Sequence, residues 1–399
     1  MKNIILCLLF FITVFYLHSC KKKTFTKQIA KKVITINPND AKQEVYLSEL
    51  VDSISYIKLE TNPDCIMGKV REIIIKGKYI YAVDQSQMQV LVFDKKGKFI
   101  SKLDKKGKGP DEYSLLGPVF ISDDEKYIEV IDLLGDKSHL FKYSNIEFDL
   151  IDRKDFSAPS ANSCRKGNDN IYYFSTQQID NSIKGEITNA DIVMVENSKI
   201  KKALFEKRII TNNMTFSPTS ETFTKNKKNE LFVSLMYNNT FFKLSNKNAY
   251  PILTVDFGEY SINNSIGLKS TSDQEKYLEK DTEGLASFPI LNANDSNVLA
   301  FSYYFKENLK NNLHQYIKLK KSKKVFHTKE IVNDITSFPN NVFISSYFYA
   351  VNHEVLYQDF LVDIVLPWYH LKEEEIKVKE IGEIKINDNP IILLMKLKE

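Results

Sequence analysis

A stretch of short β-rich segments recurs along the chain at a fixed spacing. Residues 79–103 read YIYAVDQSQMQVLVFDKKGKFISKL, three apolar runs separated by polar turns. Such runs, bounded by turn residues, are typical of an antiparallel meander. The pattern of the first two runs returns 48 residues later, so that Tyr79 and Asp84 correspond to Tyr127 and Asp132. Self-similarity with a period of about 40–50 residues indicates a propeller or another repeat array.

Four looser copies follow the two clear ones. The central strands of the six repeats are predicted to begin near Ile80, Ile128, Ile171, Leu231, Val298 and Val342. Six repeats over most of a 399-residue chain predict one closed ring. The 26 Phe and 21 Tyr against 13 Gly favour a β-rich core packed by large rings. The predicted fold is therefore all-β, a six-bladed β-propeller of four-stranded antiparallel blades.

Two further features refine this prediction. A closed ring must join its ends, and we expect an N-terminal strand at 54–59 to complete the last blade beside the strongly apolar strand at 391–397. The longest interval between repeats contains Ser272-Asp273-Gln274-Glu275, which has the pattern of a helix capping box. We therefore expect a short helical insertion around 272–280.

The first residues have the pattern of an export signal. Lys2 precedes an apolar run from Ile4 to Leu17 that is short for a membrane span. The following Leu17-His18-Ser19-Cys20 resembles a bacterial lipobox, in which the cysteine becomes the lipidated N-terminus. We expect a lipoprotein signal peptide at 1–19, a lysine-rich tether at 20–40, a propeller domain at 41–399, and lipid attachment at Cys20. The alternative is an ordinary signal peptide that is cut elsewhere.

The positive charge of the chain is concentrated in the tether. Subtracting Lys2 and the six lysines at 21–32 from the net charge of +4 leaves −3 for residues 37–399. A body without excess positive charge does not indicate a nucleic-acid partner. Lysines after Cys20, where surface-exported lipoproteins often carry acidic residues, favour the periplasmic side of the outer membrane.

Residues 80–122 resemble an NHL-type propeller repeat, in which a strand ending in Asp leads to V-x-V-F-D-x-x-G-K-F and then to a G-x-G-P-x-E-Y link. The chain as a whole is similar to the six-bladed β-propeller lipoproteins of Bacteroidetes, a family with NHL-like or TolB-like repeats. The shared elements are Ile57 to Cys65 (I-x-L-E-T-N-P-D-C), Phe257 to Tyr260 (F-G-x-Y) and Asn389 to Lys398. The likeness is strongest over 54–135 and weak over 260–340.

The resemblance implies a fold and an envelope location but no established reaction. We expect a binding module for a glycan, peptide or envelope protein, anchored to the membrane by its lipid. One alternative is a metal-dependent propeller enzyme of the lactonase, hydrolase or lyase kind. The other is a structural accessory of an outer-membrane nutrient-uptake complex.

A search for catalytic motifs favours binding over catalysis. His353-Glu354 lacks the second histidine of a zincin helix, and no G-x-S-x-G elbow is present. We therefore name no catalytic residue, cofactor or metal ligand. Asp84 and Asp132 could line a channel or a face of the ring, and the favoured interpretation is that they are structural carboxylates that end strands and cap turns. Cys65 and Cys164 could form a disulfide or remain two free thiols, and the sequence does not decide between these alternatives.

Two segments remain as a tentative ligand face. Lys108, Asp111, Glu112 and Tyr113 lie on a glycine-rich connection between blades, with packing and turn formation as the structural alternative. Trp368, Tyr369 and His370 form an aromatic cluster that could stack on a sugar ring. A buried Trp closing the last blade is the favoured alternative there.

Overall fold

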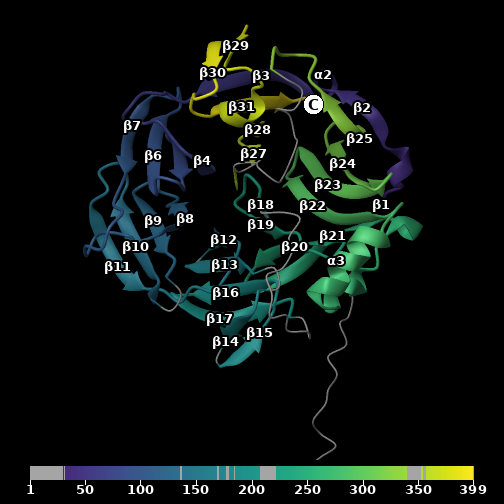
Figure 1. Cartoon of the computed structure of the whole chain (residues 1–399), viewed down its shortest axis with the longest axis horizontal. Helices are drawn as coiled ribbons and strands as arrows, with labels where there is room; N and C mark the ends of the chain where they lie inside the picture. The colour runs from purple at the N-terminus through teal and green to yellow at the C-terminus, as the bar shows by residue number, and fades with distance from the viewer. Residues whose placement is uncertain are drawn as a thin grey trace, which may run out of the picture.

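The computed structural model describes residues 30, 32–134, 137–168, 170–176, 179–183, 185–206, 222–338, 352–353 and 356–398. Six sheets stand around a common centre, as Figure 1 shows. The predicted six-bladed β-propeller is confirmed. Each blade contains four antiparallel strands, and their faces pack on those of the neighbouring blades through separate apolar clusters.

The first three blades take their strands, in order from the centre outward, from consecutive segments. Blade 1 consists of β4 (Val70–Lys76), β5 (Tyr79–Asp84), β6 (Gln89–Asp94) and β7 (Phe99–Leu103). Blade 2 consists of β8 (Leu116–Ile121), β9 (Tyr127–Asp132), β10 (His139–Ser144) and β11 (Leu150–Asp155). Blade 3 consists of β12 (Ser163–Lys166), β13 (Ile171–Ser175), β16 (Ile192–Glu196) and β17 (Lys199–Leu204), with a hairpin of β14 (Asn181–Ile183) and β15 (Glu186–Thr188) inserted between its central strands.

The last three blades include strands from both ends of the chain. Blade 4 consists of β18 (Phe223–Lys225), β19 (Leu231–Val233), β20 (Thr240–Ser245) and β21 (Asn248–Asp256). Blade 5 consists of β22 (Ala286–Asn294), β23 (Val298–Glu307), β24 (Lys310–Leu319) and β25 (Val325–Val332). Blade 6 consists of β27 (Leu356–Tyr357), β28 (Phe360–Val365), β31 (Ile391–Leu397) and β3 (Val51–Lys58).

Three blades carry a fifth, parallel strand. β1 (Val33–Thr35) and β2 (Lys42–Tyr46) extend the outer edges of blades 4 and 5. A 3₁₀ turn, η1 (Pro38–Asp40), joins these two strands, and α2 (Leu47–Leu50) leads on to β3. The fold thus takes in residues before position 41. β26 (Asn352–His353) pairs with β4 on the inner edge of blade 1.

The repeat pattern predicted the second strand of five blades correctly. β5, β9, β13, β19 and β23 begin at, or one residue before, the predicted positions. The sixth position, Val342, lies outside the described residues, and blade 6 takes its second strand from β28 instead. Both segments are short apolar runs, and composition alone does not distinguish them.

The two ends of the chain close the ring in the predicted way. β3 lies antiparallel to β31, with Val51 opposite Leu397 and Lys58 opposite Ile391. Asn389 fixes the turn beside this pair, since its side-chain amide donates to the carbonyl oxygens of Glu60 (2.6 Å) and Cys65 (2.9 Å). Its Oδ1 accepts from the backbone N–H of Met67 at 3.0 Å. One side chain therefore ties the end of the chain to the segment that follows β3.

Replacing Asn389 by Ala is expected to lower the free energy of unfolding by about 3 kcal/mol, because it leaves buried backbone groups without partners. Asn389 itself is 2% exposed. Urea denaturation followed by circular dichroism measures the change. Asn387→Ala, at an exposed position two residues away, is the control and should change stability little. Equal stability of the two variants would contradict the role assigned to Asn389.

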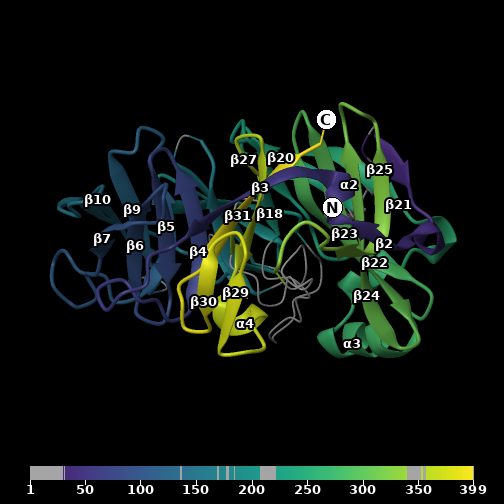
Figure 2. The same cartoon turned by 90° about the horizontal axis from the view of Figure 1, so that it is seen from above.

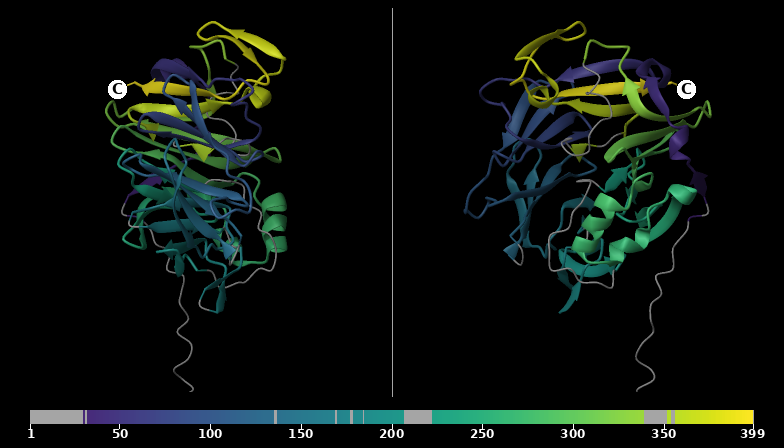
Figure 3. Two further views of the ribbon diagram at one scale, coloured as in Figure 1. Left: turned by 90° about the vertical axis from the view of Figure 1, so that its left-hand side faces the viewer. Right: turned by 45° about the vertical axis from the view of Figure 1, so that its right-hand side comes forward.

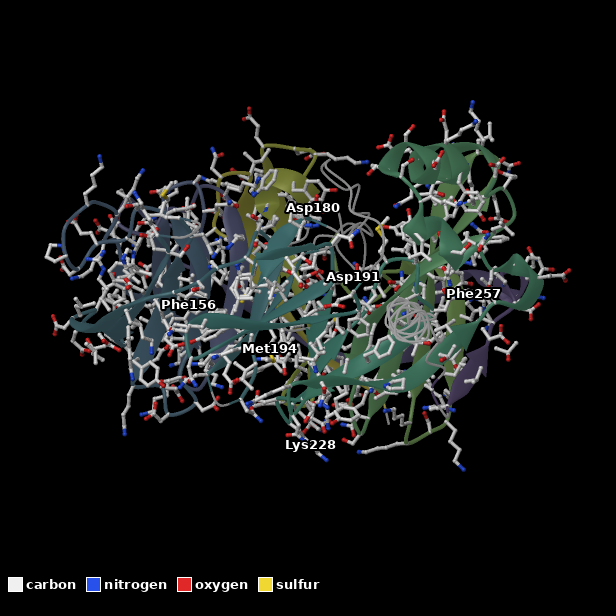
Figure 4. The ribbon with its side chains drawn as sticks, turned by 90° about the horizontal axis from the view of Figure 1, so that it is seen from below. Phe156, Asp180, Asp191, Met194, Lys228 and Phe257 are labelled. Carbon is white, nitrogen blue, oxygen red and sulfur yellow. The ribbon has the colours of Figure 1, made fainter. Side chains whose placement is uncertain are left out.

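The ring has two unlike faces. Connections between blades, such as 59–69, 104–115 and 257–285, emerge on one face, which we call the loop face. The turns within blades on the other face, which we call the turn face, are short; examples are 77–78, 122–126 and 226–230. Figures 2 and 3 show α3 (Thr271–Lys280), α4 (Pro367–His370) and the β29–β30 hairpin on the loop face. In Figure 4, Asp180 lies toward this face and Lys228 toward the turn face.

The predicted helical insertion is confirmed as α3. Its N-cap is Ser270, whose hydroxyl accepts from the backbone N–H of Asp273, so the helix begins slightly earlier than the predicted capping box. Two 3₁₀ turns precede it, η3 (Gly258–Tyr260) and η4 (Asn264–Leu268). Blade 6 carries the other insertion, α4 followed by β29 (Glu375–Val378) and β30 (Gly382–Lys385).

Cys65 and Cys164 are both buried and form no disulfide. They belong to different apolar clusters. Within the part of the chain that the structure describes, no helix combines the length and the apolar character needed to cross a membrane. Cys20 and the whole predicted signal peptide lie outside the described residues.

Candidate functional site

A cavity of about 620 Å³ lies at the centre of the ring, toward the turn face. The first strands of blades 1 to 5 (β4, β8, β12, β18 and β22) line it, together with the first turns of blades 2 to 4. Its volume falls within the range of small-molecule sites, about 300–1,000 Å³. The inner strands position the site because each blade aims one strand at the ring axis. Residues that are far apart in the sequence thereby meet in one place.

The walls of the cavity carry ion pairs between blades. Arg165 of blade 3 reaches Glu72 of blade 1, with 3.4 Å between the guanidinium and the carboxylate. Lys166 lies 2.6 Å from Glu129 of blade 2, which also accepts a 2.9 Å hydrogen bond from the Tyr172 hydroxyl. Burial, reinforced by the nearby Glu129 carboxylate, raises the pKa of Tyr172, so this hydroxyl keeps its proton. These pairs hold charged groups at fixed positions around the space.

At the mouth, Lys76 at the end of β4 lies 2.7 Å from Asp123 in the β8–β9 turn. The hydrogen bond from Lys76 lowers the pKa of the Asp123 carboxyl, and the charges of Lys225 and Lys166 act in the same direction. Three ammonium groups from three blades thus act on one carboxylate. The mouth is a charged, hydrogen-bonding surface.

Between these charges the lining offers neutral polar groups and aromatic rings. The polar groups are carried by Ser122, Asn168, Asn170, Thr224, Asn229 and Asn292. The rings belong to Phe120, Tyr127 and Phe223. Side-chain amides and hydroxyls can donate to and accept from ligand hydroxyl groups, and ring faces can stack on apolar patches. This combination suits a small molecule that is rich in hydroxyl groups.

The predicted interblade loop lies on the loop face, away from this mouth. Tyr113 is fully buried, and its hydroxyl donates to the carbonyl oxygen of Met88 at 2.7 Å. Burial raises the pKa of that hydroxyl. Asp111 pairs with Lys105 at 2.7 Å. The hydrogen bond from Lys105 lowers the pKa of the Asp111 carboxyl.

The other two residues of that loop differ in exposure. Glu112 folds back to accept from the backbone N–H of Gly109 at 2.7 Å, whereas Lys108 is exposed. Tyr113, Asp111 and Glu112 therefore shape the loop through internal contacts, as the structural alternative expected. Lys108 presents its side chain to solvent, and the Asp111 side chain is 44% exposed beside Lys105.

The predicted aromatic cluster also lies on the loop face, in α4. Trp368 is 49% exposed and Tyr369 is 37% exposed, so the favoured interpretation of a buried Trp is wrong. The Trp lies in an insertion outside the blade, and blade packing therefore does not cover it. His370 is buried, its Nδ1 accepts from the backbone N–H of Leu366 at 2.9 Å, and burial lowers its pKa. The structure thus places both predicted segments on one face, opposite the mouth of the cavity.

Asp84 and Asp132 have the predicted structural role. Asp84 is fully buried and accepts from the backbone N–H groups of Gly68 (2.8 Å) and Ser86 (3.0 Å). Asp132 accepts from the N–H of Leu115 at 2.8 Å. Each carboxylate ends a second strand and fixes the connection that enters the same blade. Their recurrence in the sequence reflects scaffold geometry.

The residues that line the cavity were not recognised in the sequence. Glu72, Lys76, Arg165 and Lys166 lie on inner strands, and Asp123 lies in an ordinary polar turn. One signal in the sequence could have identified them. Charged residues such as Lys76 and Lys166 end the first strands of their repeats, and the first strands of all blades meet at the ring axis. Across the described ranges, no group of three or more His, Cys, Asp or Glu side chains is placed to hold a metal ion.

Comparison with known proteins extends this description. The structure is similar to that of a protein described as exported from Bacteroides fragilis NCTC 9343, with 16% identity and a TM-score of 0.65, covering 92% of this chain and 100% of the other. A DUF4221 protein from Bacteroides vulgatus ATCC 8482 has 9% identity and a TM-score of 0.53, over 88% and 98%. At these identities the likeness shows the fold alone. Among curated proteins, none matches the chain in sequence. The sequence profile of DUF4934, described as a domain of unknown function, matches residues 31–396, and the chain therefore belongs to the DUF4934 family.

Proposed function

We propose that this protein is a lipid-anchored binding module of the bacterial envelope that takes a small, hydroxyl-rich ligand such as a glycan fragment in its central cavity. The observation that carries the proposal is the cavity itself, lined by amides, hydroxyls, rings and ion pairs from five blades. A closed ring pre-forms such a site, so little ordering is required when the ligand binds.

A saccharide array and calorimetry with the full-length chain in detergent test this function. Asn292→Trp places a large ring in the cavity and is expected to weaken binding of any saccharide by at least tenfold. Asn387→Trp, at an exposed position outside the cavity lining, is the matched control. If the Asn292→Trp variant binds saccharides as tightly as the wild type, the binding site lies outside this cavity. If the protein binds no saccharide, the proposed function is wrong.

The envelope location rests on the lipobox-like segment, and the similarity to an exported protein supports it. We expect Cys20→Ala to release the protein from membranes into the soluble fraction, because acyl chains supply about 0.8 kcal/mol of membrane affinity per buried CH₂ group. Fractionation with carbonate washing measures this change, and Cys65→Ala is the control. Retention of the Cys20→Ala variant in the membrane would contradict the anchor. Protease protection in intact cells would test the proposed periplasmic side of the outer membrane.

The loop face favours a second candidate function, a contact with an envelope protein such as a nutrient-uptake complex. Trp368 and Tyr369 are exposed there, as are Ile66 and Leu115 on two connections between blades. Exposed aromatic side chains are enriched in protein interfaces. Cross-linking in cells, compared between the wild type and a Trp368→Ser variant, tests this role separately from saccharide binding.

A further inference from the structure

The charged mouth of the cavity contains one acidic residue that differs from the others in its exposure. Asp123 pairs with Lys76 at 2.7 Å, yet its side chain is 86% exposed whereas that of Lys76 is 27% exposed. An ion pair with so exposed a partner contributes little to stability. The carboxylate can therefore turn away into water while the ammonium group stays at the mouth.

The acids that remain at the mouth are held by other contacts. Asp124 accepts from the hydroxyl of Ser122 at 2.8 Å and from the backbone N–H of Lys126 at 3.2 Å. Glu129 is bound by Lys166 and Tyr172, and its side chain is 7% exposed. Neither group is free to replace Asp123 as the partner of Lys76.

The cations come from the inner strands of three blades. Lys76 ends β4, Lys166 ends β12 and Lys225 ends β18. All three act on Asp123, which its lowered pKa reflects. When Asp123 leaves, these lysines and Arg165 face Glu72, Asp124 and Glu129, an excess of one positive charge. Such an excess beside partly enclosed walls attracts an anion more strongly than it would in open water.

We propose that the mouth of the cavity is an anion subsite, in which Lys76 and its neighbours Lys166 and Lys225 bind the carboxylate or sulfate group of an acidic saccharide. Asp123 occupies this subsite in the free protein as an internal substitute and swings out when the ligand's anionic group enters. The inference rests on the proposed function, because the neutral part of the saccharide lies against the amides and rings deeper in the same cavity. Uncharged saccharides leave Asp123 in place and bind more weakly.

The experiment measures calorimetric affinity for four probes: a glucuronate disaccharide, a glucose disaccharide carrying one sulfate group, its neutral glucose counterpart and inorganic sulfate. Asp123→Asn removes the competing carboxylate and is expected to tighten binding of both acidic disaccharides at least fivefold, with no effect on the neutral one. Lys76→Gln is expected to weaken both acidic probes about tenfold. The affinities for the glucuronate disaccharide and the sulfated disaccharide show whether the subsite prefers a carboxylate or a sulfate group.

Asp149→Asn is the matched control, because it removes an exposed acid from another turn of the same face and lies outside the cavity lining. Thermal unfolding of every variant excludes a folding defect as the cause of a change. Neutral and acidic disaccharides that bind equally, with no effect of Asp123→Asn, would overturn the anion subsite and leave the proposed function standing. Binding of inorganic sulfate that depends on Lys76, with no saccharide bound, would support the subsite and overturn the proposed saccharide function.

Discussion

Deleting residues 1–59 is expected to abolish cooperative folding of the propeller, whereas deleting residues 1–36 is expected to leave a folded ring. The longer deletion removes β3, so that β31 becomes an unpaired edge and blade 6 keeps three strands. Beyond residue 36 it also removes six buried apolar side chains, Val45, Leu47, Leu50, Val51, Ile57 and Leu59. At about 1.5–3 kcal/mol each, these side chains contribute roughly 10 kcal/mol or more. That is as large as the whole stability of a typical domain, about 5–15 kcal/mol.

The shorter deletion removes little by comparison. β1 pairs with the outer edge of blade 4 through three residues, and Ile36 is the buried apolar side chain that follows it. Blade 4 keeps its four strands, and the ring remains closed. We expect a decrease of about 2–3 kcal/mol in the free energy of unfolding, from the burial of Ile36 and the strand pairing.

Urea denaturation followed by circular dichroism and by tyrosine fluorescence distinguishes the two deletions. The chain that begins at residue 37 should unfold in one transition that both probes report alike. The chain that begins at residue 60 should aggregate or lose signal without a transition. A cooperative transition at the wild-type midpoint in the longer deletion would show that ring closure does not depend on β3.

The pairing of β3 with β31 could be predicted, because both strands are recognisable as apolar runs in the sequence. The four strands of blade 1 and of blade 2 are consecutive in the chain, and Tyr79 and Tyr127 mark the same point in these two blades. The strongly apolar strand at 391–397 requires a neighbouring strand on each side. The alternating run near Ile57 was the predicted strand that no other blade contained. The sixth repeat was harder to place, because Val342 and Phe360 both begin short apolar runs and no periodicity separates them.

The cavity was not predictable in the same way, because its residues meet only after the ring closes. Glu72 and Arg165 come from blades that are not adjacent in the chain, yet they form one ion pair. In the sequence each lies next to another charged residue in a short strand, which most often indicates a solvent-facing position. The error for Trp368 was the opposite one, because a residue predicted to be buried is exposed. A single Trp in a β-rich chain favours burial, but this Trp lies in an insertion outside the blade.

A second strong effect is expected from two neighbouring histidines of blade 5, His314, which is buried, and His327, which is half-buried. The Tyr303 hydroxyl lies 3.1 Å from Nδ1 of His314 and 2.7 Å from Nε2 of His327. A phenol has one proton, so Tyr303 can donate to one imidazole and accept from an N–H of the other. His314 is fully buried, and its Nε2 has no partner among the described residues. The cluster is therefore suited to neutral imidazoles.

Burial, with a smaller contribution from the nearby His327 and Lys329, lowers the pKa of His314 to about 4. Burial also lowers the pKa of His327, against the attraction of Asp40. In the unfolded chain a histidine takes up its proton near pH 6.5. The folded state thus binds fewer protons than the unfolded state between pH 6.5 and about 4. The stability that His314 provides is complete above pH 6.5 and is lost as the pH falls through this window.

Lowering the pH from 7 to 5 is therefore expected to reduce the free energy of unfolding by about 2 kcal/mol through His314 alone. His314→Phe removes the titrating group but keeps an aromatic ring beside Phe305 and Tyr303, and its stability should fall by about 2 kcal/mol less over the same range. His139→Phe, at a partly exposed histidine of blade 2, is the control for the replacement of an imidazole by a phenyl ring. Urea midpoints at pH 7, 6 and 5 give the comparison, in which carboxylate titration is common to all three proteins. Parallel curves for the wild type and His314→Phe would show that the buried imidazole does not set the acid sensitivity, whereas a flattened curve confined to His314→Phe would assign it to this residue.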